Sequence, residues 1–397
     1  MRVLHVIPNL AARTGGPPVA VVESSLALSR CGVETTIFAT DLAEAASAPT
    51  HARVTPHELP AGAESLDVRL FPARAPRRLA YSPALGRALR EHAGAYDVVH
   101  IHSLFLFPQF AAGRAARQAG VPYVVSPRGA LDPHLRRRGR AVKRISDLLW
   151  QSAMLNGAAG LHLTSDEEAR LLADLAPRVP RAVVPNGIRW TDFQDLPDGR
   201  DFRARRLGGH AGPIVMYLGR ISHKKGLDLL IRSFTSVRQS VPGARLAIVG
   251  PDDEGLTPAL AALAARLGVG ADVTFTGMLR GHDRLSALAA AVVWALPSHS
   301  ENFGIAVAEA MASGRAVVVS PAVNIAPDIA SARAGVVSDL TEAALAASIT
   351  NLLRDDVART RYGKAAREFA RRYDWAAVAP RLAAMYEGVA AQRWRAA

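Results

Sequence analysis

Short apolar runs alternate with segments of helical periodicity along almost the whole chain. In the first half of the sequence we expect seven strands, at residues 3–8, 34–40, 68–71, 97–102, 123–126, 160–164 and 182–185. In the second half we expect six more, at residues 214–219, 245–250, 273–277, 292–297, 316–320 and 335–338. Most of these runs are continuous stretches of Val, Ile and Leu, as is typical of strands buried on both faces. The alternation of such strands with helices predicts an α/β protein with parallel sheets.

The pattern is interrupted between residues 186 and 212 by a polar stretch that contains Pro197, Gly199, Gly208 and Gly209. A chain of 397 residues is long enough for two domains that each bury a core. We therefore expect an N-terminal domain at residues 1–190, a linker at 191–212, a C-terminal domain at 213–374 and a terminal helix at 375–397.

Two glutamates, Glu301 and Glu309, stand on either side of Gly304 in an otherwise apolar run. If a helix begins near Phe303, Glu309 lies about 9 Å along its axis and Glu301 lies just before its first turn. The free amides and the positive dipole end of such a helix attract an electron-rich oxygen or a phosphate, and Gly304 lets a ligand come close. One acid would then hold a ribose diol and the other a transferred sugar. A solvated helix face is the alternative, but unpaired carboxylates in an apolar run are costly, which favours a site.

A second polar segment, with Gly219-Arg220 at its start and Lys225-Gly226 at its end, follows the expected strand at 214–219. The cations of Arg220 and Lys225 would suit a diphosphate, although a cation after a strand is often only surface charge. Both segments follow expected strands, and ligands of open α/β sheets bind at the carboxyl ends of strands. Together the two segments indicate a nucleotide-sugar site.

Several motifs occur in a fixed order along the chain: Gly15-Gly16, Val-Pro-Asn-Gly-Ile at 184–188, Gly219-Arg220 with Lys225-Gly226, and Glu301 with Glu309. As an ordered set they resemble the retaining glycosyltransferases of family GT4, which have the GT-B fold. The segment Ser-Pro-Arg-Gly-Ala-Leu-Asp-Pro at 126–133 resembles a subgroup found in bacterial polysaccharide assembly. The resemblance spans nearly the whole chain. It implies two Rossmann-like parallel-sheet domains that face each other across a cleft, with the terminal helix crossing back to the N-terminal domain.

The resemblance also implies roles for particular residues. Arg220 and Lys225, the latter in preference to Lys224, would stabilise the charge that develops on the departing nucleoside diphosphate. Glu301 would contact the sugar hydroxyls, and His102, at the end of an expected strand, would face the donor sugar. A hydrogen-bonded structural histidine is the alternative at position 102. Further donor contacts are expected from Gly15, Gly16, Gly219, Asn302, Phe303, Gly304 and Glu309.

The same resemblance implies transfer from the front face of the sugar, with the departing phosphate helping to deprotonate the acceptor; a double displacement stays open. The chain has no Asp-x-Asp pair at an expected strand end, where metal-dependent glycosyltransferases commonly carry one. His5, His100 and His102 lack an evident further ligand at a fixed spacing. We expect no metal and no cofactor, only a UDP- or GDP-sugar as the donor substrate.

The formal net charge of +13 is carried mostly by arginine, which a GC-rich genome alone would also favour. Two arginine clusters lie at residues 69–90 and 128–144, in the expected acceptor domain. Arg128, Arg136, Arg137 and Arg138 would face an anionic membrane or a glycan or polyprenyl-diphosphate-linked acceptor. A lone cysteine, Cys31, excludes an internal disulfide and fits a reducing compartment, with a disulfide-free secreted protein as the alternative. We expect a cytoplasmic protein in peripheral contact with the inner face of the plasma membrane, because no apolar stretch is long enough to span a bilayer.

Other classes of protein share some of these features. A dinucleotide oxidoreductase would need a Gly-x-Gly-x-x-Gly after the first strand, which is missing here. A sugar-nucleotide epimerase of similar two-domain build remains an alternative enzyme. A basic nucleic-acid-binding protein is a further alternative, but no recognised nucleic-acid-binding signature accompanies the charge. We expect a hexosyltransferase that does not bind nucleic acid and that acts in polysaccharide or lipopolysaccharide assembly.

Overall fold

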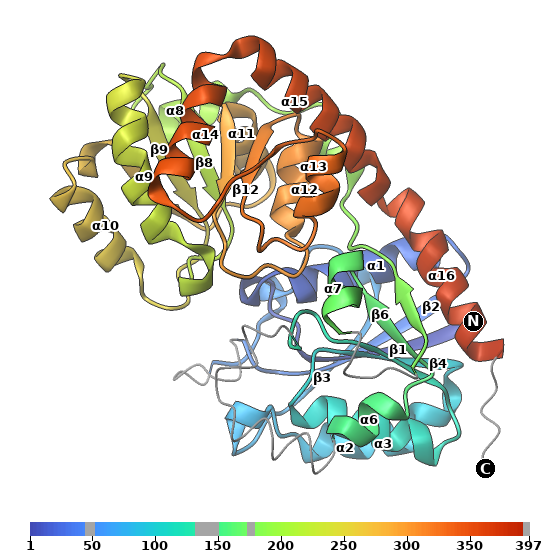
Figure 1. Cartoon of the computed structure of the whole chain (residues 1–397). Helices are drawn as coiled ribbons and strands as arrows, with labels where there is room; N and C mark the ends of the chain where they lie inside the picture. The colour runs from blue at the N-terminus through green and yellow to red at the C-terminus, as the bar shows by residue number, and fades with distance from the viewer. Residues whose placement is uncertain (44–51, 132–150, 173–178, 392–397) are drawn as a thin grey trace. The chain divides into compact units, whose positions relative to one another are not determined.

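The computed structural model of the chain describes residues 1–43, 52–131, 151–172 and 179–391. The chain divides into two compact units, Met1–Gly187 together with Trp375–Ala397, and Ile188–Asp374. The first unit thus ends at residue 187 where the sequence suggested 190, and the chain returns to it at Trp375. Both units contain a parallel sheet with helices (Figure 1).

The first unit is built on a seven-stranded parallel sheet of order β3-β2-β1-β4-β5-β6-β7. Its strands are β1 (Arg2–Asn9), β2 (Glu34–Thr40), β3 (Asp67–Phe71), β4 (Val98–His102), β5 (Tyr123–Ser126), β6 (Gly160–Leu163) and β7 (Arg181–Val183). The helices described in this unit are α1 (Gly16–Ser29), α2 (Pro83–His92), α3 (Phe107–Gln118), α6 (Ser152–Asn156), α7 (Asp166–Leu171) and α16 (Trp375–Ala391). The strand order reverses direction between β1 and β4. Open α/β sheets bind their ligands at such a switch point.

The second unit repeats the plan with a six-stranded parallel sheet of order β10-β9-β8-β11-β12-β13. Its strands are β8 (Ile214–Leu218), β9 (Arg245–Val249), β10 (Val273–Gly277), β11 (Val293–Leu296), β12 (Ala316–Val319) and β13 (Val336–Val337). Its helices are α8 (Gly199–Arg206), α9 (Leu227–Ser240), α10 (Thr257–Arg266), α11 (Gly281–Ala290), α12 (Ile305–Ala312), α13 (Ala326–Ser331), α14 (Glu342–Arg354) and α15 (Asp356–Ala370). Here the switch point lies between β8 and β11.

The expected strands all correspond to strands of the structure, within two residues at either end. The expectation of an α/β fold with two parallel sheets is therefore confirmed. Apolar runs locate these strands well because nearly every residue of the central ones is buried. No described helix is both long and apolar enough to cross a membrane.

The expected linker at residues 191–212 is a wrong prediction. This segment contains α8, which packs on α11 within the second unit. Phe202 of α8 is 3 % exposed in the core of that unit. Arg203 donates hydrogen bonds to the carbonyl oxygens of His210, Gly212 and Ala290. Arg200 and Arg205 of the same segment form ion pairs with Asp198 and Asp283, so its polar composition does not mark a free connector.

The two faces of the first sheet have different coverings. Period-two alternation puts Leu4 and Val99 on the face that packs with residues of α2 and α3. Val3 and Val98 lie on the other face, in a cluster with residues of α1 and α16. His5, His100 and His102 share the face of Val3 and Val98 because they lie two and four residues further along the same strands. Helix α16 thereby covers the histidines.

Candidate functional site

The loop that follows β8 carries Arg220. Tyr217 donates a hydrogen bond of 2.6 Å from its hydroxyl to the carbonyl oxygen of Arg220, which fixes the first turn of the loop. Gly219 has φ 154, and a Cβ there would stand 2.9 Å from the Tyr217 hydroxyl. The amide of Gly219 donates to the carbonyl oxygen of Val249, so it is used within the sheet and does not point at a ligand. Arg220 remains about one-third exposed, 3.9 Å from a carboxylate oxygen of Asp253.

The same loop continues into a short 3₁₀ turn, His223–Lys225, that is joined to the loop after β11. The carbonyl oxygen of Lys224 accepts hydrogen bonds from the His299 amide at 2.7 Å and the Ser298 hydroxyl at 2.9 Å. Gly226 follows with φ 65, and a Cβ there would lie 2.1 Å from the carbonyl oxygen of Pro297. These contacts hold Lys225 beside the segment that contains Glu301.

Lys225 and Glu301 form an ion pair, and each side chain is only 13 % exposed. The backbone of Glu301 is fixed on both sides, because its amide donates to Ala322 and its carbonyl oxygen accepts from Asn324. Burial by itself would raise the pKa of Glu301, but the positive charges of Lys225, Lys224 and Arg220 reverse this and lower it. Glu301 is therefore a carboxylate at neutral pH. The structure brings together three of the residues that the sequence assigned to one site.

Helix α12 begins at Ile305, two residues later than expected, and Gly304 is its N-cap with φ 81. A Cβ at position 304 would lie 2.8 Å from Val307, so the turn requires glycine. The Phe303 side chain is 2 % exposed and packs edge-on against Tyr373 in the core, so the expected donor contact of this residue, which stays a prediction, would be made by its backbone. Asn302 lies between Glu301 and Phe303 and is half-buried. The first amides of α12 lack intrahelical acceptors and carry the positive end of the dipole.

Glu309 lies in the second turn of α12 and forms an ion pair with Arg284 of α11. Both side chains are mostly buried, with 23 % of Arg284 and 15 % of Glu309 exposed. The sequence did not point to Arg284, because a single arginine in a helix carries no signal of its partner. Each expected donor-site charge in this unit thus has an opposite charge beside it: Asp253 for Arg220, Glu301 for Lys225 and Arg284 for Glu309.

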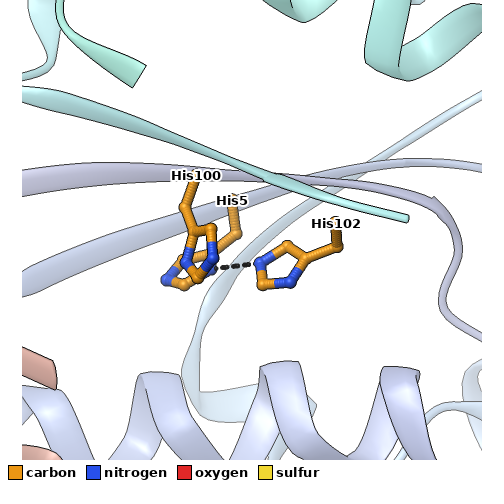
Figure 2. Close-up of side chains that lie close together, drawn as sticks. All are labelled: His5, His100 and His102. Atoms are coloured by element: carbon orange, nitrogen blue, oxygen red, sulfur yellow. Dashed lines mark hydrogen bonds between the residues drawn. The ribbon is translucent and has the colours of Figure 1, made fainter. Parts of the chain in front are cut away.

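In the first unit, His5, His100 and His102 point to the same side of the sheet (Figure 2). The expectation that His100 and His102 share a face is confirmed, with ring centroids 4.0 Å apart. His102 ends β4 and is 1 % exposed. Its Nε2 lies 2.9 Å from Nδ1 of His5, and its Nδ1 lies 3.2 Å from the guanidinium of Arg128. Both ring nitrogens of His102 are therefore engaged inside the unit, and its expected contact with a donor sugar stays a prediction.

The hydrogen-bond partners assign the proton on each of these rings. Arg128 only donates, so Nδ1 of His102 accepts, and the proton on its Nε2 is donated to Nδ1 of His5. Nε2 of His5 then carries a proton that has no partner among the described residues. Arg128 also donates to the side-chain oxygen of Asn186, which anchors the guanidinium.

A second chain of hydrogen bonds runs through His100 and His162. Nε2 of His162 donates to the carbonyl oxygen of Val184 at 2.9 Å, so its Nδ1 accepts from Nε2 of His100 at 3.3 Å. Nδ1 of His100 then accepts from the hydroxyl of Tyr386 in α16 at 2.7 Å. Every ring in the two chains is neutral in this assignment.

The surroundings favour these neutral forms. Burial, followed by the charge of Arg128, lowers the pKa of His5 and of His162 to about 3. Burial and neighbouring charges also lower the pKa of His100 and of His102 well below the usual value. Burial raises the pKa of the Tyr386 hydroxyl, which keeps it a donor.

His5, His100 and His102 are close enough to share a metal ion, with candidate ligand atoms within 4.8 Å of one another. Neutral imidazoles are good ligands for Zn²⁺ and related ions. Here, however, the lone pairs of all three rings already accept hydrogen bonds, and the guanidinium of Arg128 lies 3.2 Å from His102. A dication would have to break these bonds beside a buried positive charge, without a carboxylate in the group to offset it. The chemistry of the group therefore fits a hydrogen-bonded network better than a metal site.

The expected turn at Gly15-Gly16 follows β1 at the switch point of the first sheet. Gly15 has φ 114 and caps α1, while its own amide donates to the carbonyl oxygen of Ala12. Gly16 is the first residue of α1, where an amide has no intrahelical acceptor. Pro17 and Pro18 have no amide proton, so Gly16 is the better candidate of the two glycines for contact with a phosphate.

The arginines assigned to the acceptor or membrane surface divide into two groups. Arg128 is held by His102 and Asn186, and burial lowers its pKa to about 10. Its guanidinium supports His102 inside the unit, and its expected contact with an acceptor or a membrane stays a prediction. Arg136, Arg137 and Arg138 lie outside the described residues.

Sequence profiles of two families match the chain. The profile described as "Glycosyl transferase 4-like domain" matches residues 15–187, and that of "Glycosyl transferases group 1" matches residues 200–369. A D-inositol 3-phosphate glycosyltransferase of Frankia alni is 30 % identical over 388 residues, which is 92 % of each chain. The phosphatidyl-myo-inositol mannosyltransferase of Mycobacterium tuberculosis is 35 % identical over 228 residues, 53 % of this chain and 59 % of that protein. The chain thus matches somewhat more than half the length of these mannosyltransferases.

Among solved structures, the Anabaena protein HepE in complex with UDP-glucose superposes with a TM-score of 0.77 at 19 % identity, covering 98 % of this chain and 100 % of that one. At this identity the likeness shows the fold. The family that the ordered motifs suggested is established by the two profiles and by the relative that matches 92 % of the chain at 30 % identity. This protein belongs to the group 1 (GT4) glycosyltransferases, with the GT-B fold.

Proposed function

We propose that this protein is a retaining glycosyltransferase that moves a hexose-type sugar from a UDP- or GDP-sugar to a phosphate-bearing, lipid-linked acceptor. One observation carries the proposal. Arg220 and Lys225 follow β8, and Glu301 and the start of α12 follow β11, so both groups lie at the switch point of the second sheet. This is where an open α/β sheet binds its ligand.

The charges at this switch point match the parts of a nucleotide-sugar. The cations of Arg220 and Lys225 suit the diphosphate, which gains negative charge as the bond to the sugar breaks. The backbone amides at the start of α12 would donate further hydrogen bonds to the diphosphate. Glu301 would accept hydrogen bonds from sugar hydroxyls, and Glu309 from the ribose. On binding, the diphosphate takes the place of Glu301 as the partner of Lys225, so Glu301 becomes available to the sugar.

Purified protein incubated with individual UDP- and GDP-sugars tests the proposal. We expect one donor to be consumed, with release of its nucleoside diphosphate and a product whose anomeric configuration, measured by NMR, is that of the donor. Inversion would refute the retaining assignment. Interconversion of the nucleotide-sugar without release of the nucleoside diphosphate would instead identify an epimerase.

Transfer is expected to persist when divalent metals are chelated. In this proposal the charge of the leaving group is neutralised by Arg220, Lys225 and backbone amides. EDTA should therefore change the transfer rate by less than about twofold, which is far less than the change expected when a charged donor is removed. Rates with EDTA and after re-addition of Mg²⁺ or Mn²⁺ check this. A strict requirement for the ion would show that a carboxylate such as Asp253 serves a metal.

Replacing Glu309 with Gln is expected to weaken binding of the free nucleoside diphosphate by about tenfold, because one charge-assisted hydrogen bond to the ribose is lost. The substitution also leaves Arg284 without its partner, so it is compared with Arg284→Gln. Isothermal titration with UDP and GDP measures the effect. Equal affinity of Glu309→Gln and wild type would remove the ribose role of Glu309.

Two observations support an acceptor that carries phosphate. Two relatives that match 92 % and 96 % of this chain are named for D-inositol 3-phosphate, and one that matches 53 % of it is named for phosphatidyl-myo-inositol. The arginine-rich segment at 128–144 belongs to the first unit, and its positive charge would attract that unit to an anionic membrane. A panel of inositol phosphate, phosphatidylinositol and polyprenyl-diphosphate-linked sugars identifies the acceptor. Location at the inner face of the plasma membrane is part of the same proposal.

A further inference from the structure

The second unit contains a further concave region, which lies at the edge of the sheet opposite the donor loops. It is lined in part by Ala291 and Val292, just before β11, and by Gly314 and Arg315, just before β12. The donor loops follow the carboxyl ends of parallel strands, whereas these residues precede the amino ends. The cavity measures about 550 Å³, and α8 and α15 supply its sides. This volume would hold a ligand of nucleotide or sugar-phosphate size.

The cavity is strongly cationic. Its lining holds six basic side chains and a single acid, Asp198: the basic residues are Arg200, Arg203, Arg315, Arg359, Lys364 and Arg367. Asp198 pairs with Arg200 at 2.5 Å, and Arg359 pairs with Asp356 at 2.7 Å. The other four cations have no ion pair in the described part of the chain; they are Arg203, Arg315, Lys364 and Arg367.

Three of these cations are held in place by backbone carbonyl groups. Arg203 bonds to Ala290 at the end of α11, and Arg315 bonds to Ala289 and Ala291. Arg367 bonds to Ala312 at the end of α12, at 3.0 Å. Capping of helix ends accounts for the positions of these arginines, but not for their number. Two helix C-termini carry about half a negative charge each, which offsets about one of the four cations that have no ion pair with a described residue.

Two side chains of α15 remain for a ligand. Thr360 and Lys364 stand one turn apart and both are exposed. Neither side chain makes a hydrogen bond or ion pair with any described residue. Burial, followed by the charge of Arg367, lowers the pKa of Arg315, as expected where like charges are fixed close together. An anion in the cavity would relieve this repulsion.

We propose that this cavity is a second binding site of the protein, for a soluble solute that carries two or more phosphate groups. Arg203 and Arg315 supply fixed positive charge on one side of the solute, and Lys364 and Thr360 supply free donors from α15. More than one phosphate is required because the cations come from α8, from the start of β12 and from α15. The site is separate from the donor loops and does not depend on what they bind.

Calorimetric titration of inorganic tripolyphosphate into the full chain tests the proposal at constant ionic strength. Lys364→Glu reverses the charge of an exposed side chain that makes no hydrogen bond or ion pair with a described residue, so the fold should be retained. Arg266→Glu, at an exposed position of α10, is the matched control with the same change of charge. Because the donor loops also attract phosphate, each variant is measured with and without Lys225→Ala. We expect Lys364→Glu to weaken binding by about tenfold or more in both backgrounds, and Arg266→Glu to change it by less than about twofold, as for a screened surface charge.

Equal affinities of wild type and Lys364→Glu, or equal losses in Lys364→Glu and Arg266→Glu, would overturn the site. A second arm distinguishes a soluble phosphate from a lipid headgroup. Co-sedimentation with phosphatidylglycerol vesicles and with phosphatidylcholine vesicles is compared for the same variants. A soluble ligand predicts that Lys364→Glu leaves vesicle binding unchanged, whereas loss of binding to phosphatidylglycerol alone would assign the phosphate to a membrane lipid.

Discussion

Replacing Lys225 with alanine is expected to lower the transfer rate by about 10²–10³-fold, the usual effect of removing one preorganised donor to a developing negative charge. The structure adds a second consequence. Lys225 pairs with the buried carboxylate of Glu301, so its loss leaves that charge facing only Lys224 and Arg220. Nucleoside diphosphate release under saturating donor measures the rate.

A set of control variants separates these two effects. Lys225→Ala combined with Glu301→Gln removes the unpaired carboxylate, so it should recover the free energy of unfolding while transfer stays slow. Lys224→Ala should retain most of the rate, because the loop uses the backbone carbonyl of Lys224, which alanine also provides. An inactive Lys224→Ala together with an active Lys225→Ala would show that the cation facing the leaving group has been assigned to the wrong lysine.

The first unit is expected to lose stability steeply as the pH falls below about 6.5. The unfolded chain takes up protons on His5, His100, His102 and His162 near the usual value of 6.5, whereas the folded chain keeps them neutral to about pH 3 for His5 and His162. The unfolded state therefore binds more protons in this window. Stability is complete above pH 6.5 and declines by about 1.4 kcal/mol per pH unit for each ring that stays neutral.

His162→Gln isolates one of these rings. A glutamine amide group would donate to the carbonyl oxygen of Val184 and accept from His100, as His162 does, but does not titrate. Urea denaturation between pH 6 and pH 4 should therefore show a slope that is smaller by about 1.4 kcal/mol per pH unit than in wild type. A slope identical to that of wild type would mean that His162 is protonated in the folded protein.

The strands and the two sheets could be predicted from the sequence because their signal is local. Continuous apolar runs such as 214–218 are buried on both faces and leave a clear pattern. The prediction at 191–212 failed for the same reason: the segment looks like a solvated linker, whereas Arg203 binds the carbonyl oxygen of Ala290 and Arg205 pairs with Asp283, both far along the chain. A local pattern does not contain that information.

The candidate site was predicted in part for the same reason. Arg220, Lys225 and Glu301 could be found because each stands in or beside a glycine turn after an apolar run, and Glu309 because it follows Glu301 by eight positions in an otherwise apolar run. Their partners could not, since Lys225 and Glu301 are 76 positions apart and Arg284 has no motif of its own. His100 and Tyr386 are 286 positions apart, and their hydrogen bond forms only because α16 returns to the first unit.

The central claim is that the loops after β8 and β11 bind the nucleoside diphosphate of the donor. A crystal structure of the full chain with UDP or GDP, whichever stabilises it more, tests this most directly. The account predicts diphosphate oxygens within hydrogen-bond distance of Arg220 and Lys225, and ribose hydroxyls within that distance of Glu309. A nucleotide bound away from the carboxyl ends of β8 and β11, with Lys225 still paired to Glu301, would contradict it.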